Sequence, residues 1–342
     1  MAHNHSNLIY ALKDSKMVSI DDVESGLKCQ CRCPACGGKL VAKKGNILMH
    51  HFAHYSLTTC EYGYETSLNM AAKDILSKEK KFFIPPVYAK FPNCYKKSEL
   101  ISGAKMIKIE YVELEKLSDD VIPDVVIYTG GKKLFIKIHT MHTITIEKRQ
   151  EIHDSNISMI EIDLSKQGRI ISVEELSKIL LNDSAEKTWV YNALEKEIIQ
   201  KFISAADKYR ATLRGCALHI DFCPINRRVW RGKPYANLMN DCIYCEYCIS
   251  VINNKEILCT GRHLIANLND FNVPKVDRIK NYNEKIQKYR KRAFESGHCP
   301  NCGNVLVILN TNERVSWKCS NFPRCRYMAY TDKDTGEIIA KP

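Results

Sequence analysis

The stretch that decides the fold runs Pro123-Asp-Val-Val-Ile-Tyr-Thr-Gly-Gly-Lys-Lys-Leu-Phe-Ile-Lys-Ile-His139. An apolar run rich in β-branched residues stands on each side of Gly130-Gly131, which predicts a β-hairpin with a tight turn. Asp124 opens the first strand. Lys137 and His139 occupy alternate positions of the second strand, so we expect both to point to one face.

Further strands and helices extend this hairpin into a larger sheet. Short β-branched runs lie at 106–109 and 159–164, and apolar residues recur at helical spacing over 65–81. Residues 146–155 are long enough for a helical crossover, which makes the strands at 136–138 and 159–164 parallel neighbours. The pattern predicts an α/β fold, with a mixed sheet and flanking helices.

The second half of the chain contains three more predicted helices. The first is short, over 172–181. Asp183-Ser-Ala-Glu186 then has the spacing of a capping box and predicts a long helix to about Arg214. The third, from Val276 to Glu295, is basic and amphipathic, and we expect its Lys288 and Arg292 to contact nucleic acid.

The chain has 16 cysteines, many of them in close pairs. No uninterrupted apolar stretch approaches the ~18 residues that a membrane span needs, and the first residues lack a basic-then-apolar leader. We therefore expect a cytoplasmic protein without a membrane partner. A reducing compartment disfavours disulfides, so the paired cysteines indicate two to three structural zinc ions.

The formal net charge of +12 is unevenly distributed along the chain. Residues 201–342 carry 24 Lys and Arg against 13 Asp and Glu, whereas residues 1–200 carry 27 against 26. A basic C-terminal part favours a polyanionic partner, and nucleic acid is the usual one. The alternative is that the basic residues only keep the surface soluble.

The last cysteine module has the spacing of a zinc ribbon. Four thiolates can close a tetrahedral zinc site here, and they belong to Cys299, Cys302, Cys319 and Cys325. Aromatic and arginine side chains between them suit stacking on bases and contact with phosphates of single-stranded nucleic acid. These DNA-binding candidates are Trp317, Phe322, Arg324, Arg326 and Tyr327. The alternative is a purely structural ribbon.

The middle module offers five cysteines for four ligand places. The favoured zinc ligands are Cys223, Cys242, Cys245 and Cys259, with Cys248 as the spare. Cys245 and Cys248 make an equally good pair. Arg227 and Arg228 in this module either bind phosphates of DNA or lie on a solvated loop.

The first module combines a cysteine pair with a histidine pair. Its predicted two-Cys, two-His zinc site consists of Cys33, Cys36, His51 and His54. Three more cysteines, Cys29, Cys31 and Cys60, leave the ligand set open. The alternative is that these histidines are polar core residues or face DNA.

The hairpin carries a candidate catalytic site. Metal-assisted cleavage of a phosphodiester needs carboxylates that hold Mg²⁺ or Mn²⁺. Glu65, Asn69 and Lys73 lie on one stripe of the predicted 65–81 helix. If this stripe covers the hairpin, Glu65 and Asp124 can bind the same ion.

Seven motifs occur in order along residues 1 to about 170, namely Cys33-Pro-Ala-Cys36, His51-Phe-Ala-His54, Glu65-Thr-Ser-Leu-Asn69-Met-Ala-Ala-Lys73, Pro123-Asp124-Val, Ile136-Lys-Ile, Thr140-Met-His142 and Ile160-Glu-Ile-Asp-Leu-Ser165. With these motifs the chain resembles the CoiA-like competence protein family, whose core has the PD-(D/E)xK nuclease fold. The resemblance implies a zinc-bearing, Mg²⁺-dependent DNA nuclease that acts in foreign-DNA handling or in phage defence. The C-terminal ribbon is similar to those of type IA DNA topoisomerases, which implies DNA binding.

Within that resemblance, Asp124 and Glu65 would hold the metal, and His139 or His142 would orient water or the phosphate. The family pattern has Glu where Lys137 stands and His where Asn69 stands. An ammonium about 4 Å from a divalent ion repels it by roughly 8 kcal/mol at an effective dielectric constant of about 20. Lys137 is thus an inactivating change, the mark of a relative that only binds DNA, or the family's lysine shifted along the strand.

These observations divide the chain into six predicted parts. They are an N-terminal Cys/His zinc module (1–62), a PD-(D/E)xK nuclease-like core (63–182), a connecting helix (183–215), a middle zinc module (216–265), a basic linker helix (266–298) and a zinc ribbon (299–342). The expected function is a DNA-binding nuclease with reduced or no activity. The alternative is a non-enzymatic DNA-binding adaptor, or a regulatory subunit with a protein partner.

Overall fold

The computed structural model describes residues 8–56, 60–91, 98–114, 123–140, 144–166, 171–311, 314–332, 335 and 338–341. The chain forms two compact units. Unit 1 comprises Met1–Val87 and Leu100–Lys196, and unit 2 comprises Tyr88–Glu99 and Glu197–Pro342. Three elements cross a boundary between the units along the sequence, namely β6 (Val87–Lys90), β7 (Ser98–Ser102) and α4 (Ala193–Ser204).

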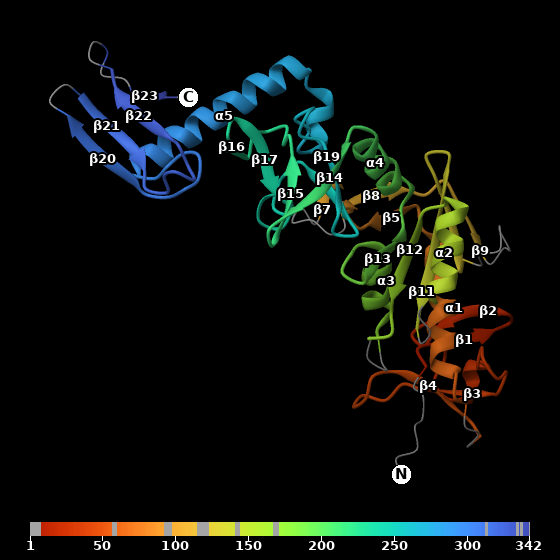
Figure 1. Cartoon of the computed structure of the whole chain (residues 1–342). Coiled ribbons are helices and arrows are strands. Elements are labelled where there is room, and N and C mark those ends of the chain that lie inside the picture. Colours follow the sequence, from red (N-terminus) through yellow and green to blue (C-terminus); the bar gives the residue numbers. More distant parts are fainter. Residues whose placement is uncertain are drawn as a thin grey trace. The chain divides into compact units, whose positions relative to one another are not determined.

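Unit 1 contains a mixed five-stranded sheet in the order β13-β12-β11-β10-β9, with small two-stranded sheets around it (Figure 1). Its elements are β1 (Tyr10–Lys13), β2 (Lys16–Ser19), β3 (Leu40–Lys43), β4 (His51–His54), α1 (Gly63–Lys78), β5 (Lys81–Ile84), β8 (Lys105–Lys108), β9 (Tyr111–Leu114), β10 (Val125–Thr129), β11 (Lys132–His139), α2 (Ile146–Ser155), β12 (Met159–Asp163), α3 (Val173–Leu181) and β13 (Lys187–Tyr191).

The predicted hairpin forms the middle of this sheet. β10 and β11 pair antiparallel around Gly130 and Gly131, which both have positive φ. β11 and β12 pair parallel, with Lys137 opposite Glu161 and His139 opposite Asp163. The helix between them, α2, supplies the crossover that the sequence predicts. The mixed α/β fold is therefore confirmed.

Alternating side chains of the central strands build a core on each face of the sheet. On one face, Leu134, Ile136 and Ile138 pack into a cluster with apolar side chains of α1 and α3. On the other face, Phe135 packs with Ile152 of α2. Helices thus cover both faces, and this packing holds the carboxyl ends of β11 and β12 in place.

The long helix predicted from Asp183 to about Arg214 is wrong. The structure has β13 (Lys187–Tyr191), α4 (Ala193–Ser204) and β14 in that stretch. The Asp183 carboxylate accepts from the amide of Ala185 at 2.9 Å, two residues on, so it forms a turn and does not cap a helix. Asn192 opens α4 instead, by accepting from the Leu194 amide at 2.9 Å.

Unit 2 contains a six-stranded antiparallel sheet in the order β16-β17-β15-β14-β19-β18 and a four-stranded sheet, β20-β21-β22-β23. Its elements are β14 (Asp207–Arg214), β15 (Ala217–Asp221), β16 (Arg228–Trp230), β17 (Lys233–Asn237), β18 (Cys248–Ile252), β19 (Glu256–Cys259), α5 (Lys275–Glu295), β20 (Leu306–Thr311), β21 (Arg314–Cys319), β22 (Met328–Thr331) and β23 (Ile338–Lys341). Short helical turns lie at Leu27–Cys29 in unit 1 and at Leu238–Cys242 and Leu268–Asn272 in unit 2.

Four other predicted helices are confirmed within a few residues. They are α1, α2, α3 and α5. A capping box between Ser172 and Glu175 begins α3, and the Thr145 hydroxyl accepts from the Lys148 amide at the start of α2. Within the described part of the chain, no helix combines the length and the hydropathy that crossing a bilayer requires.

Candidate functional site

Asp124 lies at the centre of the predicted catalytic group, and cations enclose its carboxylate. It stands directly before β10 and is 8% exposed. Its Oδ2 accepts a 2.8 Å hydrogen bond from the Ile138 amide and lies 3.1 Å from Nζ of Lys137. Its Oδ1 lies 3.3 Å from Nζ of Lys73 on α1. Both carboxylate oxygens are therefore paired with an ammonium.

Mg²⁺ or Mn²⁺ does not fit this arrangement. A divalent cation needs carboxylate lone pairs directed at it, and at Asp124 these face two ammonium groups and a backbone amide. The two ammonium groups outweigh the single charge of Asp124 and repel a divalent cation from its oxygens.

The expectation that Glu65 shares an ion with Asp124 gains no support from the helix geometry. Glu65 lies in the first turn of α1, whereas Lys73 is the α1 residue paired with Asp124. Eight positions separate Glu65 from Lys73, which corresponds to about 12 Å along the helix axis. On this face of α1, Lys73 is the residue that pairs with Asp124, and an ion shared by Glu65 and Asp124 stays a prediction.

His139 points to the same face as Lys137 but has a different partner. It is 8% exposed, and its Nδ1 lies 3.2 Å from Oδ1 of Asp163 on the neighbouring strand. The Ser165 hydroxyl, which donates to the same oxygen at 2.5 Å, lowers the pKa of Asp163 although partial burial opposes the shift. His139 is thus oriented by a carboxylate. His142 lies outside the described residues.

Glu161 is a member of this group that the sequence reasoning did not include. It is the register partner of Lys137 across the parallel pair β11–β12 and is 8% exposed. Its Oε1 is buried and has no hydrogen-bond partner in the described structure, and its Oε2 lies 3.8 Å from Arg149. The predicted crossover already implied that a residue of 159–164 would lie beside Lys137.

The C-terminal cluster brings together the four predicted thiols. The Sγ atoms of Cys299, Cys302, Cys319 and Cys325 all lie within 4.8 Å of one another. Two of the Sγ–Sγ distances are 3.7 Å and 3.3 Å. A tetrahedral zinc ion with Zn–S bonds of about 2.3 Å separates its sulfurs by about 3.8 Å. The cluster could therefore hold one zinc ion.

Two thiols of this cluster differ in acidity. Burial raises the pKa of Cys299 far above its usual range. Burial also acts on Cys302, but hydrogen bonds from the side chain and backbone of Asn304 outweigh it and lower the pKa to about 7. Zinc binds the thiolate form. Cys302 is therefore the thiol that ionises most readily for a metal at neutral pH.

The middle cysteines line one small buried cavity of about 20 Å³ in unit 2. Cys223, Cys242, Cys245 and Cys259 act on one another electrostatically, and burial raises the pKa of Cys242. Cys248 also lines the cavity, and its thiol lies 3.9 Å from the Ser250 carbonyl. The Sγ atoms of Cys223, Cys242, Cys245 and Cys259 are less tightly grouped than those of the C-terminal cluster. A middle zinc site remains a prediction.

The N-terminal cluster contains three of the four predicted zinc ligands, with Cys60 as the fourth member. Ligand atoms of Cys33, Cys36, His54 and Cys60 all lie within 4.8 Å of one another. Cys33 and Cys60 are 3.8 Å apart, and Cys36 is 3.3 Å from Nε2 of His54. A Cys₃His set is common for structural zinc. This cluster could hold a second zinc ion.

His51 is the predicted ligand that this cluster leaves out. His51 and His54 begin and end β4, three positions apart, and side chains three positions apart on a strand point to opposite faces. His51 is 7% exposed, and its Nδ1 lies 2.9 Å from the Met49 carbonyl. Cys60 stands in its place.

Residues 17–63, which include this whole cluster, match the family model of the competence protein CoiA N-terminal domain. This stretch is similar to the N-terminal domain of CoiA competence proteins. Comparisons with curated proteins and with solved structures found no match. We call residues 17–63 the CoiA-type domain. The cluster of Cys33, Cys36, His54 and Cys60 is its candidate metal centre.

On α5 and in the ribbon, the seven predicted DNA-binding residues fall into two groups. Lys288, Arg292, Arg324, Arg326 and Phe322 are exposed. Trp317 packs edge-on against Phe294, and Tyr327 is 9% exposed in the ribbon core. Both aromatics therefore pack within the ribbon, and their contact with DNA stays a prediction.

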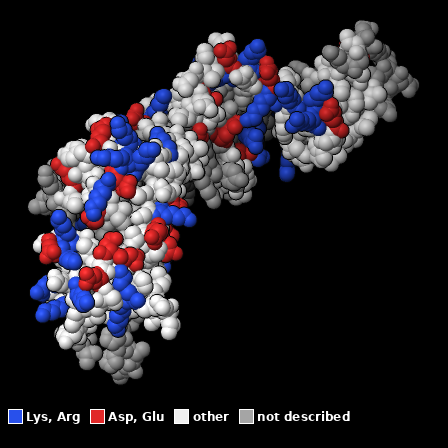
Figure 2. All heavy atoms as spheres, turned by 180° about the vertical axis from the view of Figure 1, so that it is seen from behind, with Lys and Arg blue, Asp and Glu red and all other residues white. Residues whose placement is uncertain are grey.

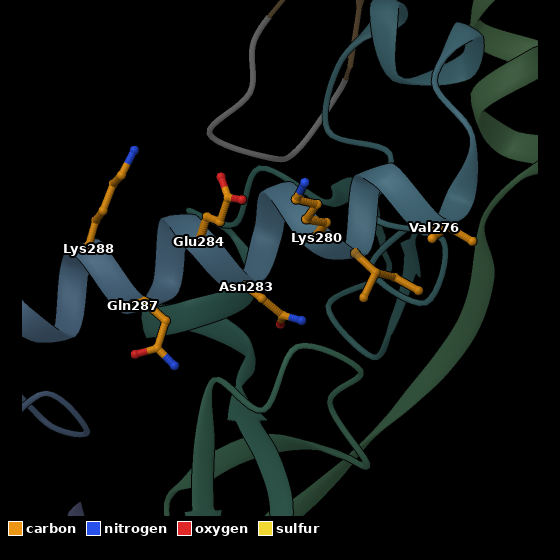
Figure 3. Close-up of a pocket in the computed structure, with 7 residues that line it drawn as sticks. Val276, Lys280, Asn283, Glu284, Gln287 and Lys288 are labelled. Atoms are coloured by element: carbon orange, nitrogen blue, oxygen red, sulfur yellow. The ribbon is translucent and has the colours of Figure 1, made fainter. Parts of the chain in front are cut away.

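Basic side chains gather where α5 lies on the surface, as Figure 2 shows. One open hollow on α5 is lined only by residues of this helix, among them Lys280, Glu284 and Lys288 at successive turns (Figure 3). Val276 and Ile279 at its start are 77% and 42% exposed. This is an exposed helix face and not an enclosed ligand pocket.

Proposed function

We propose that the chain is a DNA-binding protein of the CoiA-like type whose PD-(D/E)xK-type nuclease core is closed to metal by Lys137. In this proposal it binds DNA without Mg²⁺-dependent cleavage. The observation that carries the proposal is the ion pair of Lys137 with Asp124, 3.1 Å apart, on a carboxylate that also pairs with Lys73.

The position of the cation supports a lost metal site over an unrelated surface lysine. Nζ of Lys137 approaches Oδ2 of a carboxylate that is 8% exposed. A divalent ion held by Asp124 would sit on the same side of this oxygen. The ammonium therefore supplies the positive charge that the buried carboxylate needs, and it makes the site stable without metal.

The rest of the chain supplies the affinity for DNA. The part of the chain from 201 to 342 contains 24 Lys and Arg against 13 Asp and Glu. Exposed cations on α5 and on the ribbon, such as Lys288, Arg292, Arg324 and Arg326, would contact phosphates. The Cys33–Cys60 and Cys299–Cys325 clusters would each hold a structural zinc ion, which stabilises small modules of this kind.

The test is cleavage by the Lys137→Glu variant. We expect the unmodified protein to bind DNA and leave it intact with Mg²⁺ or Mn²⁺. We expect Lys137→Glu to cut single- or double-stranded DNA with either metal, and Lys137→Glu/Asp124→Ala to lose that activity. Lys132→Glu, the same charge change at the exposed start of β11, is the matched control and should stay inactive.

Two outcomes separate the alternatives. If Lys137→Glu binds DNA and remains inert, the core is only an adaptor, and the nuclease part of the proposal is wrong. If neither protein binds DNA at low salt, the DNA-binding part is wrong, and the regulatory subunit with a protein partner is favoured. Phosphate contacts predict that affinity falls steeply between low and moderate salt.

A further inference from the structure

The hairpin of β16 and β17 presents an exposed tryptophan at its tip. Trp230 and Lys233 are register partners that flank Arg231-Gly232. These two turn residues have φ of 49° and 78°, and positive φ at both positions is typical of a tight two-residue hairpin turn. Trp230 is 57% exposed and the preceding Val229 is 54% exposed. The turn therefore holds a large aromatic side chain in solvent.

A tryptophan this exposed is unusual in a folded protein. The other two tryptophans have protein partners, since Trp189 donates to the Pro85 carbonyl and Trp317 packs on Phe294. Trp230 instead has the guanidinium of Arg231 over its ring, 4.8 Å from the centroid. Its ring is thus presented beside a cation and has a face available to a ligand.

The base of the hairpin is fixed by a buried carboxylate. Asp241, 6% exposed, accepts from Nε and Nη2 of Arg228 at 2.5 and 3.0 Å, and from the Asn237 amide at 2.7 Å. This bidentate pair joins β16 to the turn after β17 and positions the hairpin before any ligand arrives. Arg228, which the sequence assigned to DNA, is therefore a structural residue.

The charge around Trp230 fits a polyanion. Residues 227–233 contain four cations and no acidic residue. With Arg228 neutralised by Asp241, the exposed cations of the tip are Arg231 and Lys233, and Arg227 lies at the base of the hairpin. Aromatic faces between basic side chains are the means by which proteins hold single strands, because every base has a face to stack on and its phosphates need neutralising.

We propose that Trp230 stacks on a base of single-stranded DNA, with Arg231 and Lys233 on the flanking phosphates. This inference rests on the proposed DNA-binding function. It adds that the bound DNA is single-stranded and that Trp230 contacts one of its bases. A duplex keeps its bases paired and stacked, so it offers Trp230 no base face except at its ends. The hairpin should therefore favour single strands over duplex.

Affinity measurements on the full-length chain test this inference. We expect Trp230→Ala to bind a 12-nucleotide oligo-dT about 10-fold more weakly, in line with the loss of one stacked base, and to bind duplex DNA within about 2-fold of the unmodified protein. Trp230→Phe should retain most of the affinity. Tyr55→Ala, which removes an exposed aromatic side chain of unit 1, is the matched control and should bind oligo-dT within about 2-fold of the unmodified protein.

Fluorescence gives a second readout that does not depend on affinity. The variant Trp189→Phe/Trp317→Phe leaves Trp230 as the only tryptophan of the three. Its emission should be quenched on addition of oligo-dT. Unchanged emission, or full oligo-dT affinity of Trp230→Ala in a chain that still binds DNA, overturns the inference and leaves the proposed function intact. Failure of the unmodified chain to bind any DNA overturns both.

Discussion

Nζ of Lys137 lies 3.1 Å from Oδ2 of Asp124, the same oxygen that accepts the amide of Ile138. The second oxygen of Asp124 pairs with Lys73. Across the parallel strand pair, Glu161 has a buried carboxylate oxygen without a hydrogen-bond partner among the described residues. The lysine thus stands beside two carboxylates but pairs with one. We interpret the Lys137 ammonium as the positive charge that takes the position of a metal ion at Asp124.

The ligand set of the CoiA-type domain can be tested by zinc content. Cys60→Ser should contain one zinc ion fewer per chain than the unmodified protein, because the Cys60 thiol lies 3.8 Å from Cys33 in the cluster. His51→Gln should keep all its zinc, because His51 points to the other face of β4. The measurement is metal analysis after exhaustive dialysis. Retained zinc in Cys60→Ser together with loss in His51→Gln would reverse the assignment.

Lys187 should make the stability of unit 1 depend on pH. It is 3% exposed, with Nζ 2.8 Å from the Phe83 carbonyl and 4.2 Å from the Phe82 ring centroid. Burial lowers its pKa to about 7, although Asp183 acts in the opposite direction.

The sign follows from the two protonation states. Below pH 7 both folded and unfolded chains carry the proton. Between about 7 and its unfolded pKa of about 10.4, only the unfolded chain does, so the free energy of unfolding should rise by up to about 1.4 kcal/mol per pH unit. Lys187→Met should lack this rise. Equal slopes for the two proteins in denaturant titrations at pH 7, 8 and 9 would show that Lys187 does not contribute.

Arg227 and Arg228 are neighbours with different expected roles. Arg228→Ala should lower the melting temperature of unit 2, because Asp241 would keep a buried carboxylate without its bidentate partner. Arg227 is 3.9 Å from the same carboxylate and has a 60% exposed side chain, so Arg227→Ala should leave stability nearly unchanged. It should weaken DNA binding at low salt and reduce the salt dependence of affinity by about one phosphate contact. The reverse pattern would exchange the two roles.

Much of unit 1 could be predicted because its signals are local. Gly130-Gly131 between alternating apolar runs fixes the hairpin and therefore its register, and the spacing to residues 159–164 fixes the parallel neighbour. The same logic could have identified Glu161, since the residue opposite Lys137 follows from that pairing. The contact of Lys73 with Asp124 depends on how α1 packs on the sheet, which no local pattern encodes.

The predictions of His51 as a zinc ligand and of a helix from Asp183 failed because the same residue spacing occurs in two kinds of local structure. Residues three apart, such as His51 and His54, share a metal when they lie on a helix, but β4 is a strand. Asp183 and Glu186 have capping-box spacing, yet Asp183 makes a turn before the β-branched and aromatic run of β13. Cys60 stands 24 positions after Cys36, so only the folded chain brings it to the cluster.

The central claim is that the Lys137 ammonium occupies the place of a metal ion at Asp124. Mn²⁺ binding measured by electron paramagnetic resonance tests it without reference to cleavage. On zinc-loaded protein, we predict no Mn²⁺ bound to the unmodified chain, about one ion bound to Lys137→Glu, and none bound to Lys137→Glu/Asp124→Asn. Mn²⁺ binding by the unmodified chain as tight as that of Lys137→Glu would contradict the account.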